Sequence, residues 1–304
     1  MIAQPSDRFA PISLPDLLDE AELLTRFDRK YLLDRSQAAA FLAALDRRTR
    51  VLTIDKGTGF RYQSVYFDTP DLTSYRQAAH SHRRRFKIRT RSYLDSDLTF
   101  LEVKTRGDRE VTVKDRLVYP HPTRGELTAP GRDHVEQTLN LHRLDGSAAQ
   151  LLTPTLITHY RRLTLLPPEP GTRLTIDTDL TWVLPEGHHH FLPHSDSGRQ
   201  IWQPSALSGR RWRSTDPRQP LSLPELVIVE TKSGSRPSGI DRLLWRSGHR
   251  PLSLSKYGTG LAALRGELPS NKWARVLRQH FHVATDAAIR PATTGAPNCP
   301  PPNR

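Results

Sequence analysis

Lysine and arginine recur at even spacing in several short segments of this sequence, with apolar residues between them. The charged residues that share this spacing are Arg85, Lys87, Arg89 and Arg91, Glu102 and Lys104, Lys114 and Arg116, Arg173, Asp177 and Asp179, and Glu230 and Lys232. Successive side chains of a β-strand point to opposite faces, so the pattern predicts strands with one charged and one apolar face. The chemistry that such a charged face could perform is the binding of a polyanion.

Two interpretations of the charged faces remain open from the pattern alone. The simpler one is a sheet whose charged face meets water. The other is a barrel whose charged faces point inward while the apolar faces pack outward against helices. Buried cations cost several kcal/mol each when unpaired, so this second arrangement requires a polyanion inside. The four acidic residues of the pattern could then hold a divalent cation such as Mg²⁺ or Mn²⁺ beside the anion.

The elements that must position these residues are mostly strands. The segments that alternate with a period of two are Arg26–Leu33, Phe60–Phe67, Arg83–Tyr93, Leu98–Lys104, Glu110–Tyr119, Thr155–Leu166, Thr172–Leu184 and Glu225–Thr231. The segments that favour helices are Ser36–Leu45, Pro70–Ala79, Arg132–Leu141, Gly239–Trp245 and Lys272–His282. Eight strands with few helices predict the α+β class, with an antiparallel barrel or a strongly curved sheet.

Composition limits the classes of protein to which the chain can belong. Its 304 residues include 45 Lys and Arg against 32 Asp and Glu, a net charge of +13, which favours a negatively charged partner. The one cysteine, Cys299, excludes an internal disulfide framework, a cysteine-based zinc site and an iron–sulfur cluster. We find no membrane-spanning segment, and the first 15 residues lack the apolar core of a secretion signal. We therefore expect a cytoplasmic location.

The chain divides into three predicted parts. Residues 1–19 form a flexible N-terminal lead, and residues 20–265 form one compact domain with an insertion at 186–222 that is rich in Gly, Pro, Ser and His. Residues 266–304 end in a proline-rich tail that we expect to be largely disordered.

Six segments, taken in order, are similar to a known family. They are Tyr62–Tyr75, Arg85–Arg91, Phe100–Thr105, Ile176–Leu180, Val229–Lys232 and Leu254–Tyr257. They resemble the VTC domain, the catalytic domain of the vacuolar transporter chaperone, a polyphosphate polymerase of the CYTH or triphosphate tunnel metalloenzyme superfamily. The resemblance extends from about Thr25 to Leu264. It implies a closed, eight-stranded antiparallel tunnel with a polar interior and helices outside, which is the second interpretation above.

The resemblance also implies roles for individual residues. The basic residues that would line the tunnel are Lys30, Arg89, Arg91, Lys104, Lys114, Arg162, Arg173 and Lys256. Tyr160 and Ser255 would add hydroxyl contacts to the substrate. Glu230 would be the main metal ligand, with Glu102, Asp177 and Asp179 as further candidates. One departure is that the superfamily's opening Glu-x-Glu-x-Lys pattern appears here as Arg26-Phe-Asp-Arg-Lys30, without its first acid.

The function implied by the resemblance is ATP-dependent synthesis of polyphosphate with Mn²⁺ or Mg²⁺. The γ-phosphoryl group of the nucleotide would pass to the end of a growing chain, whose ionised terminal phosphate needs no general base. Two alternatives remain: a hydrolase of triphosphate or short polyphosphate, and a polyanion-binding module without catalysis. An aromatic content of 7% and the lack of an RNA-binding motif make nucleic acid the least favoured ligand. A basic surface also leaves docking on anionic lipid or on a membrane subunit open.

Overall fold

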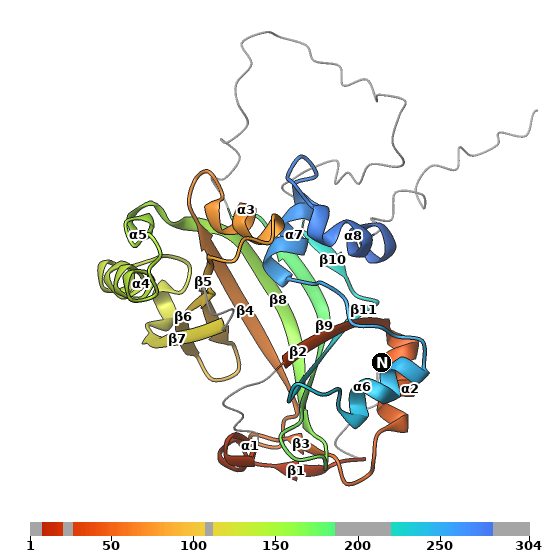
Figure 1. Cartoon of the computed structure of the whole chain (residues 1–304). Helices are drawn as coiled ribbons and strands as arrows, with labels where there is room; N and C mark the ends of the chain where they lie inside the picture. The colour runs from red at the N-terminus through yellow and green to blue at the C-terminus, as the bar shows by residue number, and fades with distance from the viewer. Residues whose placement is uncertain (1–7, 21–26, 107–111, 186–219, 282–304) are drawn as a thin grey trace, which may run out of the picture.

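The computed structural model describes residues 8–20, 27–106, 112–185 and 220–281 (Figure 1). Its strands are β1 (Ala10–Ile12), β2 (Phe27–Asp34), β3 (Arg50–Leu52), β4 (Gly59–Asp68), β5 (Arg85–Tyr93), β6 (Leu98–Arg106), β7 (Thr112–Tyr119), β8 (Thr153–Leu166), β9 (Arg173–Val183), β10 (Leu221–Leu223) and β11 (Leu226–Ser233). Its helices are α1 (Leu14–Glu20), α2 (Arg35–Ala44), α3 (Thr73–Ala79), η2 (His121–Thr123), α4 (Ala129–Leu141), α5 (Ala148–Leu151), α6 (Gly239–Arg246), α7 (Lys256–Leu264), η4 (Asn271–Trp273) and α8 (Ala274–His280).

Eight strands form the main path of an 11-stranded sheet, in the order β2-β11-β9-β8-β4-β5-β6-β7, and every neighbouring pair on this path is antiparallel. All eight predicted strands are present, and the α+β class is confirmed. The predicted closure of the barrel is not observed, because β2 and β7 lie at opposite ends of this path and do not pair among the described residues. At the β2 edge, Leu252 N donates a 2.8 Å hydrogen bond to Lys30 O, so the segment before α7 uses an acceptor that a closing strand would need.

The apolar faces of the strands pack outward against helices. On one side, Val227 and Val229 of β11 and Leu174 of β9 form a core with α2 and α6. On the other side, Ile88 of β5 and Val103 of β6 belong to a core that α4 and α5 cover. Figure 1 shows these two helical groups on opposite flanks of the long strands. The charged residues that alternate with these apolar ones therefore point to the inner face of the sheet. The first interpretation, a charged face that meets water, is not observed.

The interior is only partly polar, which corrects the expectation of a polar interior throughout. Near α3, α7 and α8 the inner face carries a core of aromatic and aliphatic side chains. Tyr66 of β4 and Trp182 of β9 belong to it, and Tyr257 of α7 packs against the Tyr66 ring with centroids 5.1 Å apart. The charged inner residues therefore share the concave side of the sheet with an apolar half.

Helix α7 is seated tightly in this apolar half. A Cβ at Gly258 would lie 2.2 Å from the Trp273 ring, and one at Gly260 would lie 2.1 Å from the Trp182 ring. Ser255 caps the helix by accepting a 3.1 Å hydrogen bond from Gly258 N. Trp182 Nε1 donates a 2.8 Å hydrogen bond to Lys256 O. These contacts fix the first turn of α7 and with it the Lys256 side chain.

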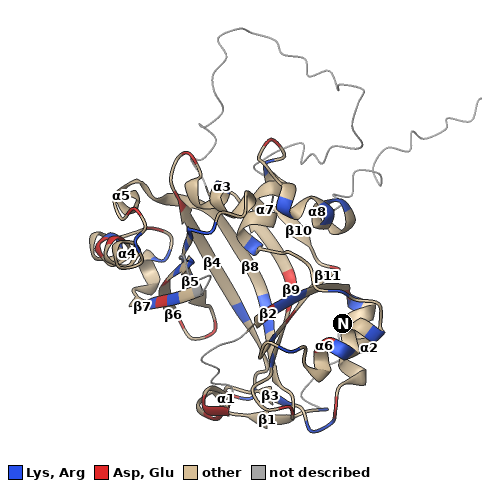
Figure 2. Cartoon of the chain, viewed as in Figure 1, with Lys and Arg blue, Asp and Glu red and all other residues tan. Residues whose placement is uncertain are grey.

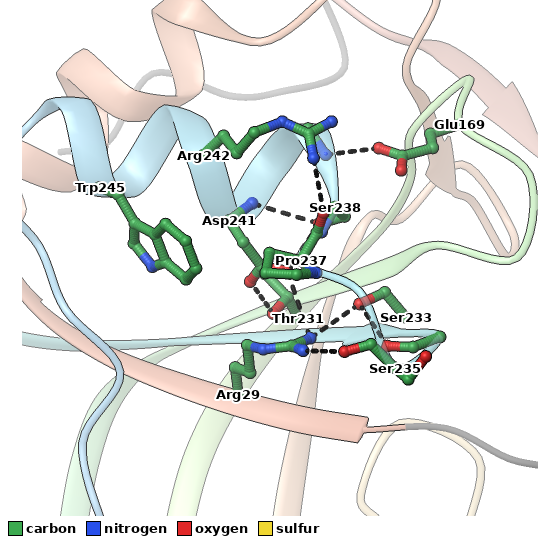
Figure 3. Close-up of polar contacts among 12 residues, drawn as sticks. Arg29, Glu169, Thr231, Ser233, Ser235, Pro237, Ser238, Asp241, Arg242 and Trp245 are labelled. Atoms are coloured by element: carbon green, nitrogen blue, oxygen red, sulfur yellow. Dashed lines mark hydrogen bonds and ion pairs between the residues drawn. The ribbon is translucent and has the colours of Figure 1, made fainter.

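On the outer face, Asp241 of α6 holds β2 and β11 together (Figure 3). Its carboxylate is fully buried and accepts hydrogen bonds from Tyr31 Oη at 2.7 Å and from Thr231 Oγ1 at 2.6 Å. Burial raises the pKa of this carboxyl, but hydrogen bonds from Thr231, Tyr31 and Ser238 outweigh burial, so the pKa lies below its usual value. Since Tyr31 and Thr231 alternate with inner-face residues, this contact also sets the register of the charged residues on the opposite face.

Several predicted boundaries need correction. The lead was expected to be flexible, but β1 pairs in parallel with β3, and α1 follows it directly. The helix predicted over Lys272–His282 is present as η4 and α8, and its Trp273 and Leu277 are buried in the core around α7. Strand β10, at the end of the expected insertion, pairs with β9. Residues 186–219 of the insertion and 282–304 of the tail lie outside the described residues.

None of the described helices has the length and apolar content of a membrane span.

We predict that Gly260→Ala lowers the free energy of unfolding by about 1–3 kcal/mol, because the added methyl group overpacks the Trp182 contact. Chemical denaturation measures the change. Gly125→Ala is the matched control, since no atom lies within 4 Å of a Cβ at Gly125. Equal effects of the two substitutions would contradict the tight seating of α7.

Candidate functional site

The first centre of the inner charged face is Glu102 on β6. Its carboxylate is 1% exposed and accepts from Arg89 at 2.6 Å and from Lys114 at 2.5 Å, with Arg91 at 3.8 Å. Burial raises the pKa of Glu102, but the surrounding cations outweigh it, and the pKa lies well below its usual range. One buried carboxylate thus holds three cations from β5 and β7.

The second centre is Asp177 on β9. Its fully buried carboxylate binds Arg162 of β8 in a bidentate manner, with distances of 2.6 and 2.8 Å, and it also pairs with Lys256 of α7. A bidentate guanidinium contact fixes both partners in orientation. The pKa of Asp177 is lowered, because these two cations outweigh the effect of burial.

The third centre joins β2 and β11, where Lys30 and Glu230 are partners in register. Glu230 lies 3.7 Å from Lys30 Nζ and 2.5 Å from Lys232 Nζ, and Lys232 also lies 3.1 Å from Asp28. The pKa of Glu230 lies well below its usual value, because Lys30, Lys232 and Arg162 outweigh the effect of burial. The Lys232 ammonium group therefore bridges two carboxylates on neighbouring strands.

Tyrosine rings separate the Glu102 and Asp177 centres. The rings of Tyr62 and Tyr160 stack with centroids 5.2 Å apart. The Arg162 guanidinium lies 5.5 Å from the Tyr62 ring and 5.3 Å from the Tyr160 ring, and Lys256 Nζ lies 4.6 Å from Tyr160. Arg89 donates a 3.0 Å hydrogen bond to Tyr66 Oη. The tyrosine side chains thus contact the same cations that the carboxylates bind.

The Tyr160 hydroxyl group is buried and has no hydrogen-bond partner among the described residues. Burial raises the pKa of Tyr160, but the charges of Arg91, Arg162 and Lys256 outweigh burial, so the pKa lies below its usual value. A buried hydroxyl without a partner carries a desolvation cost that a bound ligand would relieve. Within the described part of the chain, the Tyr160 hydroxyl group is thus an unpaired donor close to cations of the first two centres.

Beside the third centre lies a cavity of about 460 Å³, lined by Lys30 from β2 and by Lys87 and Lys104 from β5 and β6. Because β2, at one end of the strand order, and β6, next to the last strand at the other end, line one cavity, the sheet curls toward itself although it does not close. Lys87 Nζ donates a 2.9 Å hydrogen bond to Ser255 Oγ. Burial, followed by the charges of Arg89 and Lys30, lowers the pKa of Lys87 to about 7. Burial also lowers the pKa of Lys104 well below its usual value, with Arg89 and Arg91 adding to the effect.

The structure brings most of the residues expected at the site to this inner face. Those that take part in the three centres or line the cavity are Lys30, Arg89, Arg91, Glu102, Lys104, Lys114, Tyr160, Arg162, Asp177, Glu230, Ser255 and Lys256. Arg173 lies at the start of β9, opposite Lys232 in register. Basic residues are visible on the strands of the sheet as well as on the outer helices (Figure 2).

Asp179 lies away from the other acids. Between β8 and β9 the register shifts, so that two residues of β9, Asp179 and Leu180, face Tyr160 alone. Asp179 takes a left-handed backbone conformation with φ 53° and pairs with Arg35 at 2.6 Å. The bulge therefore removes Asp179 from the face that carries Asp177, and it turns Leu180 inward.

The four acids considered as metal ligands do not form one metal site. No three His, Cys, Asp or Glu residues gather with metal-ligand geometry in the part of the chain that the structure describes. Glu102 and Asp177 are each held by arginine and lysine, and Asp179 lies at the bulge. Glu230 shares the Lys232 ammonium group with a second inner-face carboxylate, Asp28, whereas Asp179 shares Arg35 with the exposed Glu225.

Sequence reasoning assigned no role to several residues of the site. Lys232 bridges Asp28 and Glu230, and its position two residues after Glu230 was the available signal. Asp28 occupies the second acidic position of the altered opening pattern. Tyr62 and Tyr66 gave no signal of their own, because an aromatic residue in a strand is more often part of a core.

Comparison with protein families finds a match to the VTC domain over residues 25–265. The chain belongs to the VTC domain family. The match covers the main sheet, α7 and all three charged centres. No curated protein sequence matches the chain.

Solved structures with a similar arrangement are distant from this VTC domain. A putative adenylyl cyclase from Hippeastrum, described as having a dominant triphosphatase activity, is 13% identical, with 80% of this chain and 97% of that chain covered and a TM-score of 0.42. A putative adenylate cyclase from Bacillus halodurans is 10% identical, with coverages of 72% and 86% and a TM-score of 0.38. A conserved hypothetical protein from Pyrococcus furiosus is 11% identical, with coverages of 74% and 88% and a TM-score of 0.34.

We predict that the free energy of unfolding rises between pH 7 and pH 9, and that Lys87→Met reduces this rise by about 1–2 kcal/mol. The unfolded chain keeps this lysine protonated up to its ordinary pKa of 10.5, whereas the folded chain releases the proton near 7. The unfolded state therefore binds more protons in this window, and raising the pH favours the folded state. Denaturant titration at pH 7 and pH 9 measures the change in the free energy of unfolding, and Lys56→Met, at an exposed lysine, is the control. An unchanged pH dependence in Lys87→Met would contradict the assignment.

Proposed function

We propose that this chain is an ATP-dependent inorganic polyphosphate polymerase, which transfers the γ-phosphoryl group of the nucleotide to a growing polyphosphate chain. The observation that carries the proposal is the convergence of cations from β2, β5, β7, β8 and α7 on the inner face of the sheet. Membership of the VTC domain family supports it, since the resemblance of its motifs implies this activity.

The charge balance of the site suits a phosphate chain. Seven cations contact four carboxylates at the three centres, which leaves the inner face positive without a ligand. Arg89 and Arg162 are held in fixed orientations by their carboxylates, so little reorganisation is needed when they contact phosphate oxygens. Catalysis of phosphoryl transfer consists mainly of such positioning and charge neutralisation.

The state of the carboxylates favours phosphate over water as the attacking group. At the three centres Glu102, Asp177 and Glu230 all have lowered pKa values, because each is paired with cations. A carboxylate that activates water needs a pKa closer to neutrality and a free lone pair. The terminal phosphate of a polyphosphate chain is already ionised at neutral pH and needs neither. The paired carboxylates therefore favour the polymerase over the hydrolase.

The part of the acidic set that fits a divalent cation is the pair of Glu230 and Asp28, which share the Lys232 ammonium group. Mg²⁺ is commonly held by one or two carboxylates and completes its shell with substrate phosphates and water. When bound, Mg²⁺ or Mn²⁺ would offset charge on the phosphate oxygens. Lys30 and Lys232 would then turn from Glu230 toward those oxygens.

Incubation of the purified chain with ATP and Mn²⁺, followed by gel separation of the products, tests the proposal. We expect ADP together with long phosphate chains. ADP with orthophosphate, or AMP with short phosphates, would identify a hydrolase instead. Unchanged ATP with retained nucleotide binding would identify a binding module.

We predict that Glu230→Gln lowers turnover at least about a hundredfold, because the substitution removes a negative charge at the third centre. Circular dichroism should show that the fold persists. Glu225→Gln is the matched control, because Glu225 is exposed and forms its ion pair with Arg35, away from the three centres. Full activity of Glu230→Gln would refute the assignment of Glu230.

A further inference from the structure

The inner face of β6 becomes apolar on one side of the first centre. Phe100 is two residues before Glu102 on this face, whereas Lys104, two residues after it, lines the cavity. Val118 of β7 is the register partner of Phe100, so the two side chains lie side by side on the same face of the sheet. An apolar surface therefore adjoins the Glu102 centre on the side away from the cavity.

This apolar surface is both exposed and rigidly supported. Val118 is 67% exposed, and Leu98, two residues before Phe100, is 43% exposed. On the neighbouring strand β5, the Tyr93 ring meets the Phe100 ring edge to face with centroids 6.1 Å apart, and it lies 4.8 Å from the Tyr62 ring. Apolar side chains exposed together beside a charged site are typical of a surface that contacts a ligand.

A guanidinium group lies over this surface. The Arg116 guanidinium is 4.9 Å from the centre of the Phe100 ring. The Arg116 side chain is exposed, and it forms no ion pair with any residue that the structure describes, whereas Lys114 on the same strand pairs with Glu102. Arg116 is therefore able to move from the ring to the far side of a planar ligand. An aromatic ring and a guanidinium plane are the two kinds of surface on which proteins stack heterocyclic bases.

The position of Phe100 suits the base of a nucleotide whose phosphates lie at the first centre. The Cα atoms of Phe100 and Glu102 are about 7 Å apart along the strand, a length that a ribose spans between its base and its first phosphate. Arg91 is the register partner of Phe100 on β5 and lies 3.8 Å from Glu102, so a cation is available beside the ring for that phosphate.

We propose that Phe100, Val118 and Arg116 form a subsite for the base of a nucleoside triphosphate, in which the base stacks on the Phe100 ring and the Arg116 guanidinium covers its other face. The inference rests on the proposed function, in which the charged centres bind the phosphates of a nucleotide. The subsite favours a nucleotide over inorganic triphosphate, because inorganic triphosphate has no group that reaches Phe100. It does not select one base over another, since stacking does not read the hydrogen-bonding edge of a base.

The test compares the affinities of the whole chain for ATP and for inorganic triphosphate by isothermal titration. Phe100→Ala should lower the affinity for ATP about tenfold, a usual loss for one stacked base, and should leave the affinity for triphosphate unchanged. Phe100→Tyr keeps the ring and should retain the wild-type affinity for ATP. Arg116→Lys keeps the charge but not the plane, and it should weaken the binding of ATP alone.

Phe27→Ala is the matched control. Phe27 is 52% exposed, and the Arg29 guanidinium lies 5.9 Å from its ring, so the pair has the same composition as Phe100 and Arg116. Phe27 lies on the outer face of β2, because it alternates in step with Tyr31 of the outer core. Both affinities should therefore stay at their wild-type values in Phe27→Ala.

The outcomes separate this subsite from the proposed function. An unchanged affinity of Phe100→Ala for ATP, or an equal fall in both affinities, would overturn the subsite, as would a wild type that does not bind ATP. A wild type that binds ATP but makes no phosphate chains contradicts the proposed function. In that case the dependence of ATP binding on Phe100 still decides whether the subsite exists.

Discussion

The structure depends on the pairing of buried cations with a few buried carboxylates. Seven lysine and arginine side chains at the three centres could not share one concave face without Glu102, Asp177, Glu230 and Asp28 between them. Glu102, Asp177 and Glu230 each join cations from different elements, so the ion pairs also connect the strands and α7 to one another. The remaining positive charge on the inner face is what makes the site suitable for a polyanion.

Packed apolar regions around the charged residues offset the free-energy cost of burying them. Apolar side chains on the outer strand faces pack against α2, α6, α4 and α5, so two of the hydrophobic cores lie outside the sheet. Inside, α3 and α7 fill the apolar half and fix Lys256 through Trp182 and Ser255. The charged half therefore lies between two packed regions that hold its strands in register.

The sequence was sufficient to predict the strands and the direction in which their charged faces point, but not the details that depend on tertiary contacts. Alternation in Arg85–Arg91 and in Val229–Lys232 marks strands with one apolar face, and the resemblance to the VTC domain selects the inward arrangement. Closure failed as a prediction because the segment at Leu252 bonds to the β2 edge, and no local pattern encodes that contact. Helix α7 was missed because Gly258 and Gly260 are poor helix formers, retained here for their contacts with Trp273 and Trp182.

The bulge at Asp179 has a consequence for how β9 serves both halves of the interior. Before it, Leu174 and Ile176 face the outer helices and Asp177 faces the cations; after it, Leu180 and Trp182 face the core around α7. One additional residue thus changes which side chains face inward: odd-numbered residues before the bulge and even-numbered residues after it. Deletion of Asp179 would restore one uninterrupted alternation of inner and outer side chains along β9. Either Asp177 or Trp182 would then point to the wrong face of the sheet. The length of this strand is therefore as constrained as its composition.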